Sequence, residues 1–254
     1  MSWLKAIIHS ALGCVLVSSV YYLPKPKVIE LLYNYTPYVF IHIPKNGGSA
    51  VNKWIKQSQC PYISKVVHEE TAKSTLLFGQ QPIAIIRHPV DRFISNYYYW
   101  KHGSEDIKPW QRTKEWRKAD HIHNIHDFIY ILSHKSHPLH LHTKRQINTR
   151  DHYTWLHFLA QSYWIGKNED KTHIICYHHT ALQQHIQRAL DNLGIPCKVT
   201  LNKVNISMHK ANQSNKLTKK EQDWIANEYA EDMRLWQRHC QKLDEDSIKQ
   251  AATP

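Results

Sequence analysis

Glycine is scarce in this 254-residue chain, which contains seven. So few glycines exclude collagen-like and Gly-rich low-complexity chains, and they draw attention to any adjacent pair. Acidic residues are also few: 21 Asp and Glu stand against 33 Lys and Arg, so the formal charge is +12 before any of the 20 histidines is protonated. This excess predicts an anionic partner, which could be nucleic acid, an anionic membrane, a nucleotide or a polyanionic glycan.

Cysteines are few as well, and no CxxC pair occurs among them: Cys14, Cys60, Cys176, Cys197 and Cys240. An odd, scattered set fits neither a small disulfide scaffold nor a zinc knuckle. We expect mostly buried thiols in preference to a set of disulfides. Three sequons, at Asn34, Asn205 and Asn212, would matter only in a secretory compartment.

The chain does have the length and the apolar content to bury a substantial core, since 42 % of its residues are hydrophobic. Short β-branched and aromatic runs predict strands, and longer periodic stretches predict helices. The strands are expected at 38–43, 83–86 and 172–177, and the helices after 49 and at 90–100, 124–133, 152–163, 180–193 and 218–240. Strands that alternate with helices predict a single α/β domain, in which a parallel sheet is flanked by helices.

The N-terminal segment from Ala6 to Leu23 has 18 residues and reads AIIHSALGCVLVSSVYYL. That length is at the lower limit for crossing a bilayer. We favour a single-pass membrane anchor with a linker in residues 1–27; a cleaved signal peptide and a helix packed on the domain are the alternatives. The folded domain is then expected at 28–242, and 243–254 is a polar tail.

The strongest chemical signal is YVFIHIPKNGGSAV at residues 38–51. A glycine turn between a buried strand and a helix presents backbone N–H groups and a positive dipole end to an anion. Lys45 precedes the glycines, whereas the Walker A pattern GxxxxGK[ST] places lysine after them. This order argues against an ordinary ATP or GTP hydrolase. The bland alternative is an ordinary strand-to-helix connection.

The order Pro-Lys-x-Gly-Gly-Ser resembles the 5'-phosphosulfate loop of sulfotransferases that use 3'-phosphoadenosine 5'-phosphosulfate (PAPS). A second segment, IAIIRHPVDRFISNYYYW at 83–100, resembles the 3'-phosphate segment of that family, although His88 stands where the family usually has Asp. The resemblance implies a P-loop-like sheet. It also implies that Arg87 and Ser95 bind the 3'-phosphate and that one run binds the 5'-phosphosulfate: Lys45, Asn46, Gly47, Gly48, Ser49 and Ala50.

The run SNYYYWKHGSEDIKPWQRTKEWRK resembles the uronyl 2-O-sulfotransferases that act on heparan or dermatan chains. In those enzymes a histidine before the second strand is the catalytic base, and His68 holds the matching position. A hydroxyl acceptor needs a base with a pKa near ambient pH, which histidine supplies. Glu69 or Glu70 is the alternative base, and His68 could also be an ordinary histidine. Lys45 would stabilise the charge that develops on the leaving phosphate.

The basic, Trp-containing segment 101–118 is predicted to hold an anionic acceptor through Lys101, Lys108, Arg112 and Lys114. We favour a glycan over single-stranded nucleic acid, with a plain solvated face as the third interpretation. Seven histidines crowd residues 121–142, but they complete no recognised metal-ligand spacing, and the resemblance implies a reaction without a metal. Weaker landmarks of the family follow in AQSYWIG (160–166), Tyr229 and Asp232.

The expected function is therefore transfer of a sulfuryl group from PAPS to a hydroxyl, most simply of a carbohydrate. The alternatives are a nonenzymatic protein that binds glycans or nucleic acid on the same fold, and a nucleotide kinase, which the loop order disfavours. The catalytic domain must face the compartment that holds PAPS. That is the Golgi lumen in a eukaryote and the cytoplasm in a bacterium; a soluble cytoplasmic protein is the alternative to the membrane-associated one.

Overall fold

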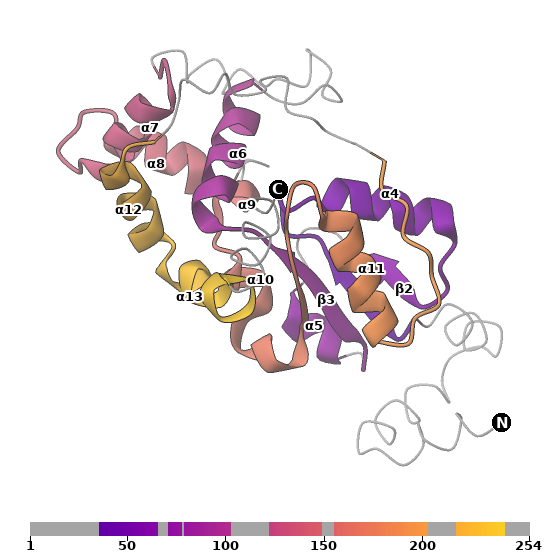
Figure 1. The fold of residues 1–254 in the computed structure, drawn as a ribbon. Coiled ribbons are helices and arrows are strands. Elements are labelled where there is room, and N and C mark those ends of the chain that lie inside the picture. The colour runs from indigo at the N-terminus through magenta and orange to yellow at the C-terminus, as the bar shows by residue number, and fades with distance from the viewer. Residues whose placement is uncertain are drawn as a thin grey trace, which may run out of the picture. The chain divides into compact units, whose positions relative to one another are not determined.

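The computed structural model of the protein describes residues 36–65, 71–77, 79–102, 122–148, 155–202 and 217–241. Parallel strands alternate with helices in this part of the chain, as the sequence predicts (Figure 1). The elements are β1 (Tyr38–Ile41), α4 (Gly48–Ser58), β2 (Ile63–Lys65), α5 (Ala72–Leu77), β3 (Gln81–Ile86), α6 (Pro89–His102), α7 (Ile125–Ser133), α8 (His140–Asn148), α9 (Trp155–Phe158), α10 (Ser162–Ile165), the 3-10 helix η3 (Gly166–Lys171), β4 (His173–Cys176), α11 (Leu182–Asn192), α12 (Lys219–Glu228) and α13 (Ala230–His239).

The four strands form one sheet in the order β2-β1-β3-β4, and every neighbouring pair is parallel. Tyr38 of β1 pairs with Ile63 on one side and with Gln81 on the other. After β1 the chain moves outward to β2 and then returns past β1 to form β3. The winding direction therefore reverses between β1 and β3, at the place where open α/β sheets bind their ligands, beyond the carboxyl ends of the strands.

Alternating side chains of the strands build two separate cores. Phe40, Ile83 and Ile85 face α4 and α11, whose buried residues include Trp54 and Ile186. The opposite face of the sheet carries a second buried cluster, to which α5, α10 and α13 also contribute: Ile41, Ala84, Ile86, Cys176, Ala72, Trp164, Ile165 and Leu235. Burial on both faces explains why the strands are near-continuous apolar runs.

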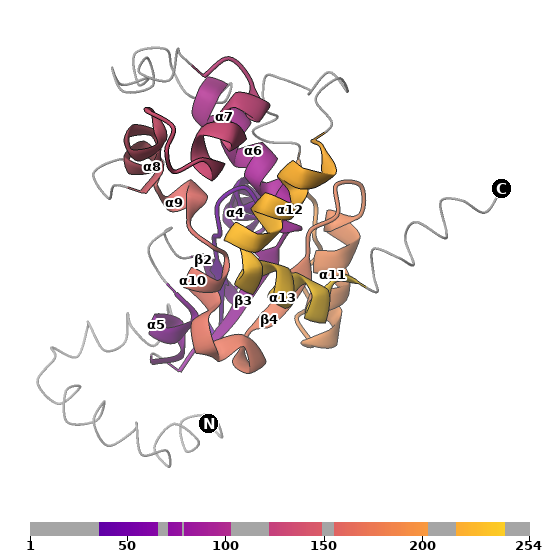
Figure 2. The same ribbon diagram turned by 90° about the vertical axis from the view of Figure 1, so that its left-hand side faces the viewer.

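A third core joins α6, α7, α8, α9 and α12 beside the sheet (Figure 2). Phe128 of α7 is fully buried, and its ring centroid lies 5.7 Å from that of Phe93 on α6 and 5.8 Å from that of Phe158 on α9. The apolar face of α6 is thereby fixed from several sides. Tyr99 of the same helix contacts Lys45 in the turn after β1.

The cysteine prediction is wrong for four of the five cysteines. Cys60 is bonded to Cys197, and Cys176 is bonded to Cys240. Cys60 follows α4 and Cys197 follows α11, and these two helices pack on the same face of the sheet. Cys176 ends β4 and Cys240 follows α13, which lies against β4. The paired residues are 137 and 64 positions apart in the chain, so tertiary packing alone brings them together.

The predicted helices are confirmed in part. Thr218 and Glu221 form the expected capping box at the start of α12. Gly194, with a left-handed φ of 66°, follows the end of α11 as predicted. The helix predicted at 218–240 is divided into α12 and α13 at Tyr229, where ψ is 41°. The helix predicted at 152–163 is replaced by the short α9 and α10. The sequence pattern missed β2, α5 and α8 altogether.

Several predictions concern residues outside the described ranges. These are the anchor at 6–23, the linker up to 27, the tail at 243–254 and most of the basic segment 101–118. Within the described part of the chain, no helix is long and apolar enough to cross a membrane.

Candidate functional site

The turn that joins β1 to α4 has the backbone of an anion-binding loop. Lys45 adopts a left-handed conformation with φ 68°, which is rare outside glycine, and Gly47 follows with φ 82°. Across the described residues, the N–H groups of Gly47, Gly48 and Ser49 meet no acceptor. They open α4, which is 11 residues long, so its dipole adds positive potential to these donors.

Both glycines of the turn are required by close packing. A Cβ atom on Gly48 would overlap the ring of His42, and a Cβ atom on Gly47 would lie 2.7 Å from Cδ2 of Leu182. His42 is itself held in place, because Nδ2 of Asn52 donates to its Nδ1 over 2.9 Å. The glycine pair therefore lets α4 begin directly against the end of β1.

Arg87 brings a second cation to this turn from the end of β3. Its Nη1 donates to the carbonyl oxygen of Lys45 over 3.2 Å, and its guanidinium lies 4.6 Å from the ring centroid of Tyr177. Tyr177 follows β4 and also flanks Gly47. The buried Nε of Arg87 has no acceptor within the described ranges. The two basic residues that the sequence separates by more than 40 positions are thus in contact.

The side chain of Lys45 is partly buried, and it has no counter-ion among the described residues. Its Nζ lies 4.2 Å from the ring centroid of Tyr99 on α6, a cation–π contact. The imidazole of His157 stacks on the ring of Tyr99, with 4.5 Å between the ring centroids. No carboxylate of the described residues pairs with Lys45 or Arg87. Burial, followed by repulsion from Arg87, lowers the pKa of Lys45 from 10.5 to about 8.

Two cations at the reversal point of a parallel sheet are costly for the protein to keep when no carboxylate of the described residues pairs with them, since each loses part of its hydration without gaining an anionic partner. A bound anion removes that cost. The arrangement is therefore suited to a ligand that carries negative charge at two places, one over the N–H groups of the turn and one beside Arg87.

The side chain of Asn46 faces the protein. Nδ2 of Asn46 donates to the carbonyl oxygen of Ile85 over 2.7 Å and to Oε1 of Gln161 over 2.6 Å. The side chain therefore fastens the turn to β3. Only the backbone N–H of Asn46 remains as a contribution to an anion.

Arg92 is a structural residue of the site that the sequence reasoning missed. It is 2 % exposed, and it donates to three carbonyl oxygens, those of Pro44, His157 and Leu159, at 2.7–3.1 Å. These bonds tie the β1 turn to the end of α9. They also occupy carbonyl oxygens that a continuous helix would use for its own hydrogen bonds. The available signal in the sequence was the segment RHPVDR, in which Arg92 follows Arg87 by five residues.

The remaining predicted residues are placed as follows. Ser49 and Ala50 lie in the first turn of α4; Ser95 is on α6, one turn before Tyr99, and its hydroxyl forms no hydrogen bond with the described residues. Lys101 is half-buried in the last turn of α6. His68, Lys108, Arg112 and Lys114 lie outside the described residues. The histidines of 122–142 form no group of three potential metal ligands with one another or with other described residues.

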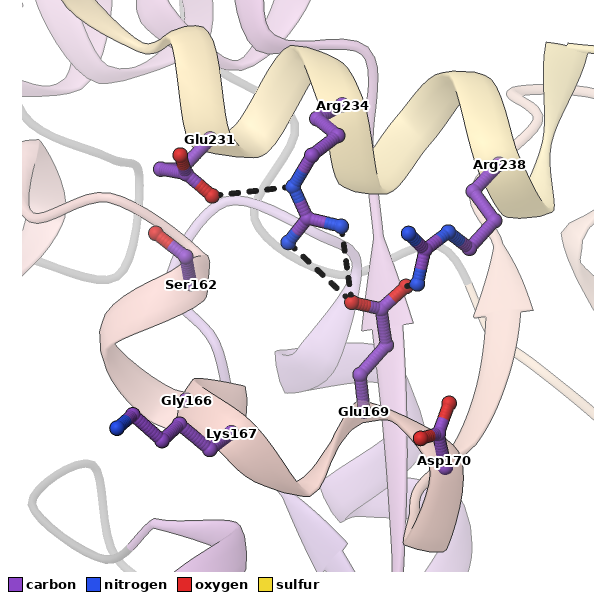
Figure 3. A pocket seen from close by; sticks show the side chains of 8 residues that line it. All are labelled: Ser162, Gly166, Lys167, Glu169, Asp170, Glu231, Arg234 and Arg238. Carbon is purple, nitrogen blue, oxygen red and sulfur yellow. Dashed lines mark hydrogen bonds and ion pairs between the residues drawn. The ribbon is translucent and has the colours of Figure 1, made fainter.

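A separate hollow of about 340 Å³ lies between α13 and the turn of α10 and η3 (Figure 3). Several of its charges are paired: Arg234 and Arg238 reach from α13 to Glu169, which His239 also contacts. Burial raises the pKa of Glu169, but the hydrogen bond from His239 and the two guanidinium charges outweigh it, so this pKa lies below its usual range. These contacts hold α13 against η3, near the start of β4, and involve none of the residues of the turn.

Comparisons with protein-family models, with curated proteins and with solved structures give no match to the chain.

Proposed function

We propose that the protein is a sulfotransferase that moves a sulfuryl group from PAPS to a hydroxyl group. The observation that carries the proposal is the contact between two cations, Lys45 and Arg87, for which the described residues supply no carboxylate partner. Both lie where the sheet reverses direction between β1 and β3, beside the turn whose N–H groups meet no acceptor among the described residues. PAPS carries a phosphosulfate on its 5' carbon and a phosphate on its 3' carbon, so it offers anions at two fixed places. The P-loop-like character of the sheet is part of the same proposal.

The proposed roles follow the placement of the residues. The N–H groups of residues 46–49 and the ammonium of Lys45 bind the 5'-phosphosulfate, while Arg87 and Ser95 bind the 3'-phosphate. The N–H of Ala50, which the sequence also placed in this group, donates to the carbonyl oxygen of Gly47 over 3.1 Å. In the transfer, the acceptor oxygen forms a bond to sulfur as the bond from sulfur to the phosphate oxygen breaks. Lys45 stabilises the charge that develops on that phosphate oxygen. The acceptor proton passes to a base, for which His68 is our candidate.

We further propose that the acceptor is an anionic carbohydrate and that the site faces an oxidising lumen. The charge of +12 greatly exceeds what Lys45 and Arg87 use, which favours an anionic acceptor. Two disulfides within one domain are typical of secretory compartments and rare in a reducing cytosol. The Golgi lumen is an oxidising compartment and also holds PAPS, so we propose it as the location of the site.

Binding of 3'-phosphoadenosine 5'-phosphate (PAP) by the full chain tests the nucleotide site. We expect wild type to prefer PAP to AMP, and Arg87→Ala to weaken PAP binding by about 10- to 100-fold, the range for a hydrogen-bonded charge. Arg188→Ala, on the exposed side of α11, is the matched control. Equal affinities for PAP and AMP in wild type would contradict a 3'-phosphate site.

Transfer of radiolabelled sulfate from PAPS to a panel of glycans, lipids and small alcohols tests the reaction itself. Lys45→Ala is expected to reduce turnover by about 100-fold, the effect of losing one donor to developing charge. Full activity of that variant would contradict its role. Tight PAP binding without transfer to any member of the panel would favour the nonenzymatic alternative.

A further inference from the structure

Gln161 is the point at which the two halves of the candidate site are fastened together. Its side chain is fully buried between the turn and the end of β3. Oε1 accepts from Nδ2 of Asn46 over 2.6 Å and from the backbone N–H of Arg87 over 2.9 Å, while Nε2 donates to the carbonyl oxygen of Arg87 over 2.9 Å. One amide therefore grips both the turn that carries Lys45 and the residue that supplies the second cation.

Gln161 is held firmly from the opposite side. Its backbone N–H donates to Oδ2 of Asp232 over 2.7 Å, and the N–H of Ser162 donates to Oδ1 of the same carboxylate over 2.9 Å. Asp232 lies on α13 and is fully buried. The side chain of Gln161 therefore starts from a fixed backbone, and its three hydrogen bonds form a rigid link.

We propose that Gln161 is a positioning residue that sets the separation between the β1 turn and Arg87, and thereby selects a ligand with two phosphate groups at one fixed spacing. The inference rests on the proposed function, since it assumes that both cations bind one nucleotide. Two anionic groups on one ligand reinforce each other only when both binding elements are held at the matching distance. A ligand with one phosphate requires no such match.

The test compares three nucleotides on the full chain: PAP, 5'-AMP and 3'-AMP. Each AMP isomer can engage one of the two elements, whereas PAP can engage both. Gln161→Met keeps the side-chain length and removes the three hydrogen bonds. We expect it to weaken PAP binding by about tenfold or more, through lost effective concentration, and to change the affinity for either AMP by less than about threefold.

Gln187→Met is the matched control. Gln187 on α11 also forms three hydrogen bonds, to Asp191, Cys197 and Val199, but none of them reaches the turn. This variant is expected to keep the wild-type ratio of PAP to AMP affinities even where it lowers the thermal midpoint. A loss in Gln161→Met that is equal for all three nucleotides would show ordinary destabilisation and would overturn the inference.

A second variant covers the case in which Gln161→Met fails to fold. Gln161→Glu keeps the acceptor for Asn46 and for the N–H of Arg87, but it replaces the donor to the Arg87 carbonyl by an oxygen and adds a negative charge, so the comparison uses the ratio of PAP to AMP affinities. It is expected to reduce the PAP preference in the same direction; an unchanged preference would refute the positioning role. If wild type itself does not prefer PAP, the proposed function fails. If wild type prefers PAP and the variants keep that preference, only this inference fails.

Discussion

Replacing Lys45 by methionine is expected to stabilise the protein while it abolishes anion binding. Lowering a lysine pKa from 10.5 to about 8 means that the folded state disfavours the charged form, by about 3 kcal/mol at 1.36 kcal/mol per pH unit. Solvent reaches part of the side chain, so we expect a gain of about 2–3 kcal/mol at pH 7. For a domain of this size, that raises the thermal midpoint by up to roughly 10 °C.

The pH dependence of this gain follows from the same shift. The unfolded lysine titrates near 10.5 and the folded one near 8, so between these values the unfolded state binds more protons. Wild-type stability must therefore rise with pH across that window. The advantage of Lys45→Met is full below pH 8 and disappears above about pH 10.5, where Lys45 is neutral in both states.

Denaturant unfolding of wild type and Lys45→Met at pH 7 and pH 10 measures the effect, together with PAP binding at pH 7. Lys53→Met is the control, because Lys53 is an exposed residue of α4, the helix that follows the turn, and should change neither quantity greatly. The reasoning is refuted if Lys45→Met is less stable than wild type at pH 7, or if its gain is the same at both pH values.

Two further changes test the packing around the site. Replacing Cys176 and Cys240 together by alanine opens a loop of 64 residues, which predicts a loss of about 4 kcal/mol from chain entropy and a drop of roughly 8–16 °C in the thermal midpoint. When both proteins are measured with reductant, their midpoints are expected to differ little, and the absence of a drop without reductant would argue against this pair. Gly48→Ala should lower the free energy of unfolding by about 1–3 kcal/mol, because its Cβ overlaps the ring of His42. In chemical denaturation, the double variant Gly48→Ala, His42→Ala should recover part of that loss, whereas strictly additive losses would contradict the contact.

The sequence predicted the central fold because its signals are local. β1, β3 and β4 are apolar runs bounded by turn residues, and Gly194 and the Thr218 box mark helix ends directly. The edge strand β2 has three residues, Ile63–Lys65, which is too short for a periodic pattern. The break at Tyr229 escaped prediction because its cause is tertiary: the hydroxyl of Tyr229 donates to the carbonyl oxygen of Phe158.

The candidate site divides in the same way. The turn and Arg87 could be found because glycines and a strand end mark them in the sequence. The support could not: Gln161, Asp232 and Arg92 act through contacts with residues 48 to 115 positions away. The disulfides belong to this second class, since nothing in the spacing of five cysteines says which of them meet.

The order in which the site is synthesised differs from the order in which it is assembled. Lys45 and Arg87 leave the ribosome in the first third of the chain, but Gln161 follows much later, and Asp232 and Cys240 come near the end. A nascent chain therefore carries the turn and its two repelling cations without the groups that hold them. The proposed nucleotide site is therefore complete only after α13, which carries Asp232, has been translated.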